Sequence, residues 1–144
     1  MELHHISLPT AYMIETLRSQ GITNQEILNR IKKKDITPWV QINEHFDFNE
    51  LVRLAEQDQA AFTSIILDGY KIKFITIRGL QTLLKLKFNL IEGRDYQRTE
   101  KGIKDLHIDE NSLSILKQML SKNCTLYEEA SSQTGQPSIR IELA

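Results

Sequence analysis

The chain of 144 residues has a single cysteine and no long hydrophobic run. Cys124 has no second cysteine to pair with, which rules out an intramolecular disulfide and a zinc site built from several thiolates. Uninterrupted apolar runs such as Ile65–Leu67 are only a few residues long, whereas a membrane-spanning helix needs about 20. The first residues also lack the basic and apolar regions of a secretory signal. We therefore predict a cytoplasmic protein without a membrane segment.

Residue patterns that carry catalysis or bind metals are also missing. His4 and His5 are adjacent and point apart, while His45 and His107 have no partner at ligand spacing. No Cys-His signature surrounds Cys124, and the glycines are isolated, so that no phosphate-binding loop is formed. No pair of acidic residues stands out as a general acid and base. We therefore predict no enzymatic activity, no cofactor, no metal and no small-molecule substrate.

The composition is that of an ordinary globular domain, with 40% apolar and 26% charged residues. Residues 1–36 predict an N-terminal helical hairpin, because Gly21 ends one helical pattern and Thr23 with Glu26 forms a capping box for the next. That second pattern ends in Lys32–Lys34, cations that a helix C-terminus favours.

Residues 37–144 predict an α+β core domain, which we expect to form one compact unit with the hairpin. Asp47 and Glu50 form a second capping box, followed by a long central helix of up to about 20 residues that can kink near Asp58. A further helix is expected from Thr76, its N-cap, to Asn89.

Short alternating segments predict a small, mostly antiparallel sheet around a C-terminal helix that Asp109 caps. The expected strands are 70–75, 95–99, 103–108, 125–129 and 138–143, and 39–42 is either a strand or an extended connector. The fold class is therefore α+β. Most aromatic residues lie at apolar positions of these elements and are expected in the core: Phe46, Phe48, Phe62, Tyr70, Phe74 and Phe88.

Charge is sorted along the chain in blocks, although the net charge is only −1. The blocks 1–34, 35–68, 69–104 and 105–144 carry +2, −6, +6 and −3. The basic block has nine Lys/Arg against three Asp/Glu, so it can meet an acidic protein surface or a polyanion. The alternatives for the same block are a solvated face that only confers solubility, or internal pairing with the acidic block before it.

The basic block supplies most of the candidate binding residues. We expect a protein partner, bound through Arg78, Lys85, Arg94, Arg98 and Lys101 together with an exposed Trp39. Tyr127 is a second expected exposed aromatic anchor. The protein would then be a small regulatory protein, an inhibitor or adaptor that recognises its partner by complementary charge.

The alternative hypothesis is a DNA-binding transcriptional regulator. Gly21–Thr23 between two helices partly resembles a helix-turn-helix, and Arg30, Lys32, Lys33 and Lys34 would assist the basic segment 70–104. Leu17 and Arg30 depart from the pattern of that motif, in which a small and an apolar residue are expected. We favour the protein partner, because nucleic-acid-binding domains are usually basic overall and this chain has a pI of about 6.4.

Overall fold

The computed structural model of the protein describes residues 3–130 and 137–144. Within these residues the chain forms six α-helices and six strands, which confirms the predicted α+β class. The first half is almost entirely helical. Its elements are β1 (His5–Ile6), α1 (Leu8–Ser19), α2 (Asn24–Lys32), a 3₁₀ helix (Thr37–Trp39), α3 (Asn49–Gln57) and α4 (Gln59–Asp68).

Both helices of the predicted N-terminal hairpin form, but α1 packs mainly on α5 and α2 on α3 and α4, and side-chain caps start each of them. The Ser7 hydroxyl accepts a hydrogen bond from the backbone N–H of Thr10 at 3.3 Å. The Thr23 hydroxyl accepts one from the N–H of Glu26 at 3.1 Å. Gly21 lies between the helices at φ 84°, a left-handed conformation that glycine adopts without strain.

The predicted long central helix is instead two helices, α3 and α4, which meet at Asp58. The backbone of Asp58 is extended, at φ −160° and ψ 98°, and its carboxylate caps α4 by accepting from the N–H of Ala61 at 3.0 Å. Aspartate competes with helix formation in this way because its short side chain can bond nearby backbone donors. The expected capping box of Asp47 and Glu50 is not formed, because α3 begins one residue later with Phe48 at its N-cap, and the Asp47 carboxylate accepts instead from the N–H of Asn49 at 3.1 Å.

The second half supplies the remaining helices and the larger sheet. Its elements are β2 (Lys71–Ile72), α5 (Ile77–Phe88), β3 (Gln97–Arg98), β4 (Gly102–Leu106), α6 (Glu110–Met119), β5 (Cys124–Ala130) and β6 (Pro137–Leu143). Thr76 and Asp109 cap α5 and α6 as predicted. The sheet is antiparallel with strand order β3-β4-β6-β5, while β1 and β2 form a separate parallel pair. The predicted strand 70–75 is thus reduced to two residues.

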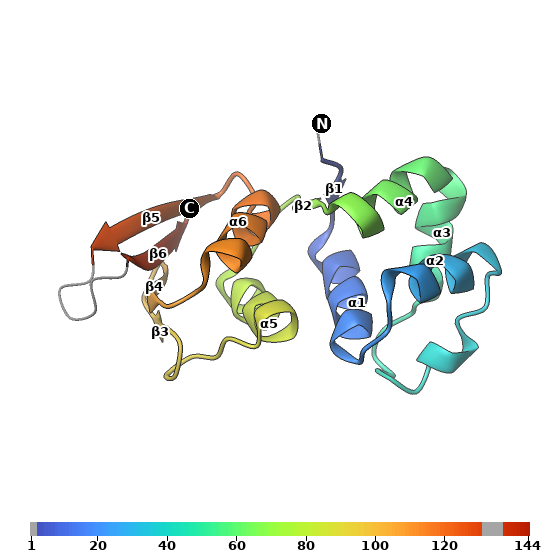
Figure 1. Cartoon of the computed structure of the whole chain (residues 1–144), viewed down its shortest axis with the longest axis horizontal. Coiled ribbons are helices and arrows are strands. Elements are labelled where there is room, and N and C mark those ends of the chain that lie inside the picture. Colours follow the sequence, from blue (N-terminus) through green and yellow to red (C-terminus); the bar gives the residue numbers. More distant parts are fainter. Residues whose placement is uncertain (1–2, 131–136) are drawn as a thin grey trace.

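Helices α1 to α4 gather at one end of the molecule, and α5, α6 and the larger sheet lie at the other (Figure 1). The two ends meet where α1 packs against α5 and where β1 pairs with β2. Ile14 and Leu17 of α1 and Leu80 and Leu84 of α5 are completely buried. Gly79 permits the close approach of the helices, because a Cβ atom there would lie 2.5 Å from Leu8 Cδ2 and 2.9 Å from the Tyr12 hydroxyl.

Helices on both sides of the predicted boundary at residue 36 pack together, α2 with α3 and α4, and α1 with α5. The division into 1–36 and 37–144 remains a prediction about folding units, which packing alone does not test. Most of the predicted core aromatics are buried or half-buried. Phe74 is the exception, with 57% of its surface exposed, because β2 ends at Ile72 and the alternation that predicted a buried Phe74 does not continue.

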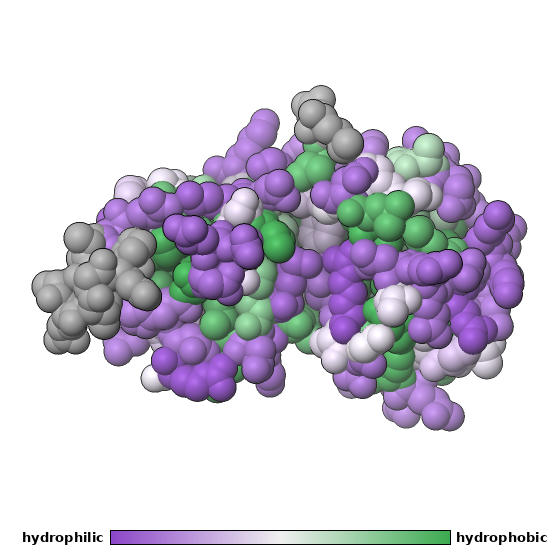
Figure 2. Space-filling view, in the orientation of Figure 1, coloured by the Kyte–Doolittle hydropathy of each residue, from purple (hydrophilic) through white to green (hydrophobic). Residues whose placement is uncertain are grey.

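The surface is mostly hydrophilic on the face shown in Figure 2, where apolar residues form separate patches instead of one continuous area. Within the described residues, no helix is both long enough and apolar enough to cross a membrane.

Candidate functional site

One stripe of α5 forms the first wall of a surface cleft. Arg78, Gln81, Thr82 and Lys85 follow the spacing i, i+3, i+4, i+7, which places them on one face of an α-helix. The opposite face carries Leu80, Leu83 and Leu84, all buried in the core. The amphipathic pattern of α5 therefore turns the two cations of this stripe toward solvent.

The second wall is the loop that follows α5, residues 89–96. Asn89 is left-handed at φ 57°, and the N–H of Leu90 donates back to the Leu84 carbonyl at 3.0 Å, which reverses the chain sharply. The Asp95 carboxylate accepts from the Ile91 N–H and from Arg94 Nε, each at 2.9 Å. These bonds hold the pKa of Asp95 below its usual range, with the bond from Arg94 as the largest cause. The loop is therefore fixed by its own hydrogen bonds.

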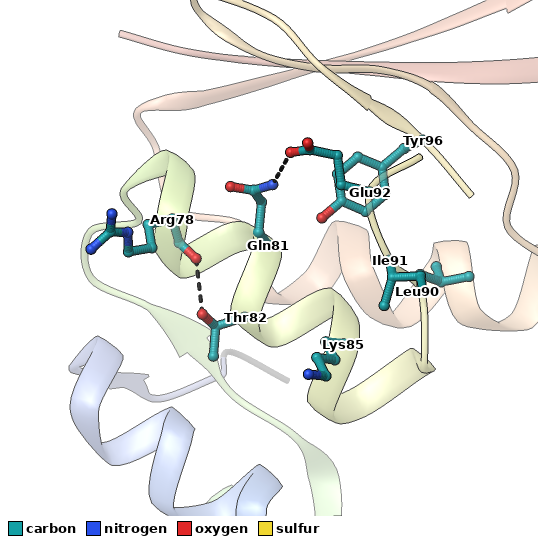
Figure 3. A pocket seen from close by; sticks show the side chains of 8 residues that line it. All are labelled: Arg78, Gln81, Thr82, Lys85, Leu90, Ile91, Glu92 and Tyr96. Atoms are coloured by element: carbon teal, nitrogen blue, oxygen red, sulfur yellow. Dashed lines mark hydrogen bonds between the residues drawn. The ribbon is translucent and has the colours of Figure 1, made fainter. Parts of the chain in front are cut away.

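Between these two walls lies a cleft of about 260 Å³ that contains charged, polar and apolar groups. Eight residues line it: Arg78, Gln81, Thr82, Lys85, Leu90, Ile91, Glu92 and Tyr96. Figure 3 shows Gln81 reaching from α5 to Glu92 of the loop, where its amide donates to the carboxylate at 2.7 Å. Burial raises the pKa of Tyr96, so its hydroxyl stays protonated at neutral pH.

Both cations of the cleft are exposed, and no carboxylate of the described residues lies within 4 Å of either. Arg78 also lies in the first turn of α5, where the helix macrodipole adds positive potential. The arrangement can attract a ligand with two separated negative charges and pack an apolar group against Leu90 and Ile91.

The other predicted basic residues lie outside the cleft. Arg94 is engaged in the adjoining loop, where it pairs with Asp95 at 2.9 Å and donates to the Asn89 carbonyl. Arg98 and Lys101 are exposed on the β3–β4 hairpin, which directly follows the loop. The structure thus brings Arg78 and Lys85 together and leaves Arg98 and Lys101 on a separate, neighbouring element.

The N-terminal cations are partly neutralised. Arg30 pairs with Asp35 at 3.2 Å, and Lys34 pairs with Glu56 of α3 at 2.9 Å, while Lys32 and Lys33 are exposed. The contact with Glu56 places the acidic helix α3 beside the C-terminal end of α2. A DNA duplex that approached α2 would therefore also meet negative charge.

The expectation that Trp39 is an exposed anchor is wrong. Its side chain is 1% exposed and packs edge-to-face on Phe48, with ring centroids 5.9 Å apart. The residues around it form a 3₁₀ turn, and neither the predicted strand nor the extended connector is present, so the indole is turned into the core. Tyr127 is exposed as predicted, and the guanidinium of Arg140 lies 4.0 Å from the centre of its ring.

A buried charged cluster behind α5 was not predicted from the sequence. The Glu15 carboxylate of α1 is 1% exposed and accepts from Arg18 at 3.0 Å, Lys87 of α5 at 3.1 Å and the Tyr70 hydroxyl at 2.5 Å. Arg18 also donates to the Ile66 carbonyl of α4 at 2.7 Å. The cluster therefore fixes α5 to the N-terminal helices from the side opposite the cleft. Only the unusual position of Glu15 within the apolar pattern of α1 could have signalled it.

Searches against protein-family models, curated proteins and solved structures found no match for this chain. Across residues 3–130 and 137–144, no group of three or more His, Cys, Asp or Glu side chains is placed to hold a metal ion. Burial raises the pKa of the Cys124 thiol, which therefore stays protonated at neutral pH.

Proposed function

We propose that this chain is a small regulatory protein that acts by binding another protein, as an inhibitor or adaptor, and that it is not an enzyme. The cleft beside α5 carries the proposal, because it combines two cations, the apolar side chains of Leu90 and Ile91, and a loop held by its own hydrogen bonds. Such preorganised sites bind with less loss of entropy than mobile ones. We place this regulator in the cytoplasm, where the thiol of Cys124 would stay reduced.

Charge separation supports a protein partner with a complementary surface. Acidic residues of block 35–68 lie on and around α3 and α4 at one end, and most basic residues of block 69–104 lie on α5, on the loop after it and on the β3–β4 hairpin at the other end (Figure 1). Opposed charges of this kind orient an approaching partner and raise the rate of association.

DNA binding is the second candidate, and the exposed Arg98 and Lys101 of the hairpin favour it. Two observations weigh against it. The carboxylate of Glu92 lies in the cleft, and Glu56 of α3 lies beside α2. Both carboxylates repel a phosphate backbone, whereas a protein partner can place its charges to avoid them.

Site-specific photo-cross-linking in the native host tests the proposal. Thr82, in the cleft, is replaced by p-benzoyl-phenylalanine, and Gln25, exposed on α2, is replaced in a matched control. We expect one discrete protein to be cross-linked at position 82 and not at position 25. The cross-link should be lost when Arg78→Glu and Lys85→Glu are added, because the attractive charges are reversed.

Adding Lys32→Glu and Lys33→Glu instead gives a control with the same change in net charge. That control should keep the cross-link at position 82. Recovery of nucleic acid at position 82, or equal protein capture at both positions, contradicts the proposal.

A further inference from the structure

The chemistry of the cleft indicates what kind of segment it accepts. We propose that it binds an extended acidic segment of the partner, in which two carboxylates three residues apart flank an apolar side chain. This inference rests on the proposed protein-binding function and names the recognised element. Arg78 and Lys85 would bind the two carboxylates, and Ile91 with Leu90 would contact the apolar side chain.

The spacing of the two cations sets the spacing of the two acids. Arg78 and Lys85 are seven residues apart on α5, which corresponds to about 10 Å along a helix that rises 1.5 Å per residue. A polyproline II segment repeats every three residues and rises about 3.1 Å per residue, so side chains i and i+3 face the same way about 9 Å apart. Acids at i and i+3 therefore match the two cations.

Backbone donors favour an extended segment over a helix. The interior N–H groups of a helix are bonded to its own carbonyl groups, whereas an extended chain leaves its N–H groups free. Glu92 and the side-chain carbonyl oxygen of Gln81 line the same cleft as acceptors, and they can bond free N–H groups of such a segment.

The same acceptors argue against a nucleic acid in the cleft. A nucleic-acid strand carries a phosphate at every residue and has no backbone N–H donor, so Glu92 would repel it. Ile91, which is 36% exposed, supplies apolar surface that a phosphate chain would not use. A peptide with acids at its two ends can use the two cations, the two apolar side chains and the two acceptors of the cleft.

Titration of uniformly ¹⁵N-labelled full-length protein with short peptides tests the inference. The probe is the peptide GELPEG in one-letter code, whose two acids are three residues apart, and the matched control GEELPG has the same composition with adjacent acids. We expect GELPEG to bind at least about fivefold more tightly and to shift amide signals of residues 78–96. Arg78→Glu with Lys85→Glu should weaken binding at least about tenfold.

Variant and competitor controls make each outcome decisive. Lys32→Glu with Lys33→Glu should leave the affinity unchanged, and the neutral pair Arg78→Gln with Lys85→Gln should lose affinity while keeping a folded spectrum. Equal binding of the two peptides, no binding of GELPEG, or tighter binding of a six-residue thymidine strand at the same amides overturns the inference. If these peptides fail while the cross-link at position 82 still depends on Arg78 and Lys85, the protein-binding function stands and only the acidic-segment inference falls.

Discussion

The Glu15 carboxylate is almost completely buried, and it accepts hydrogen bonds from three donors on separate parts of the chain. Removing one partner from such a group leaves charge without compensation, which costs more than the net contribution of the bond itself. Tyr70 is the most informative partner to remove, because its hydroxyl is buried and forms the shortest of the three contacts. Burial, with a further contribution from the Glu15 carboxylate, raises the pKa of Tyr70 far above its ordinary value.

Tyr70→Phe should lower the free energy of unfolding by about 1–3 kcal/mol at pH 7, because the Glu15 carboxylate loses a donor. The matched control is Tyr127→Phe at an exposed ring, which should change the free energy of unfolding by less than about 0.5 kcal/mol. Urea denaturation of both variants measures the difference. Equal stability of Tyr70→Phe and the wild type would contradict the structural role of the cluster.

The same residue predicts how stability changes at alkaline pH. The folded state keeps the Tyr70 proton, whereas the unfolded chain releases it near pH 10. The protonated hydroxyl therefore makes its full contribution to the free energy of unfolding below pH 10, and this contribution is lost as the pH rises further. Urea titrations between pH 9 and pH 11 should show a shallower decline in Tyr70→Phe than in the wild type. Some decline should remain, because burial also raises the pKa of Tyr12 and Tyr96. Identical pH slopes would show that Tyr70 ionises equally in both states.

At the scale of elements, the sequence predicts structure best where a cap and an apolar period agree. The helix from Thr76 and the helix after Asp109 are both confirmed, because each combines a side-chain cap with a buried stripe. The central helix was predicted too long, since the apolar period continues through Asp58 while its backbone is extended. The core position of Trp39 could not be predicted, because it depends on contact with Phe48 after the chain has folded.

The cleft was predicted only in part, for a related reason. Arg78 and Lys85 could be placed on one polar stripe from their spacing alone. The loop residues Glu92 and Tyr96 face that stripe because Asn89 is left-handed and Asp95 bonds the loop backbone. No periodic pattern encodes such a reversal, so the second wall of the cleft becomes visible only in the structure.

Leu84→Asp should unfold the protein or lower its stability by at least about 3 kcal/mol, because it buries an unpaired carboxylate in the core against α1. Lys85→Asp is the neighbouring control, and we expect it to change stability by about 0.5 kcal/mol or less at an exposed position. Thermal melts followed by circular dichroism measure the stability of both variants. An unchanged melting temperature for Leu84→Asp would mean that the buried face of α5 is assigned wrongly.

Pairing in the larger sheet predicts that a substitution at Gly102 of β4 lowers stability. A Cβ atom there would lie 1.9 Å from the backbone oxygen of Ile141 in β6, and a strand backbone cannot move aside without breaking the pairing. Gly102→Ala should therefore destabilise the protein by about 1–3 kcal/mol or more. Lys101→Ala, next in the chain and exposed, should be close to neutral. Chemical denaturation showing equal stability of the two variants would contradict the β4–β6 packing.

At the scale of the whole molecule, a net charge of −1 hides two ends of opposite sign. The blocks were visible in the sequence, but the structure shows which charges are paired. Arg30, Lys34 and Arg94 have acidic neighbours, whereas Arg78 and Lys85 face the cleft. We therefore expect a partner of opposite charge to bind the basic end, and not helices α1 and α2.

Fluorescence anisotropy of a labelled random-sequence DNA duplex, titrated with the wild-type protein at two salt concentrations, measures whether the basic end binds DNA. We predict feeble binding at physiological salt, with a dissociation constant weaker than about 10⁻⁴ M, because Glu92 lies in the cleft with Arg78 and Lys85, and Glu56 pairs with Lys34. Tight binding whose salt dependence corresponds to several released counterions, and which Arg78→Glu with Lys85→Glu abolishes, would contradict a protein partner and establish DNA as the ligand of this surface.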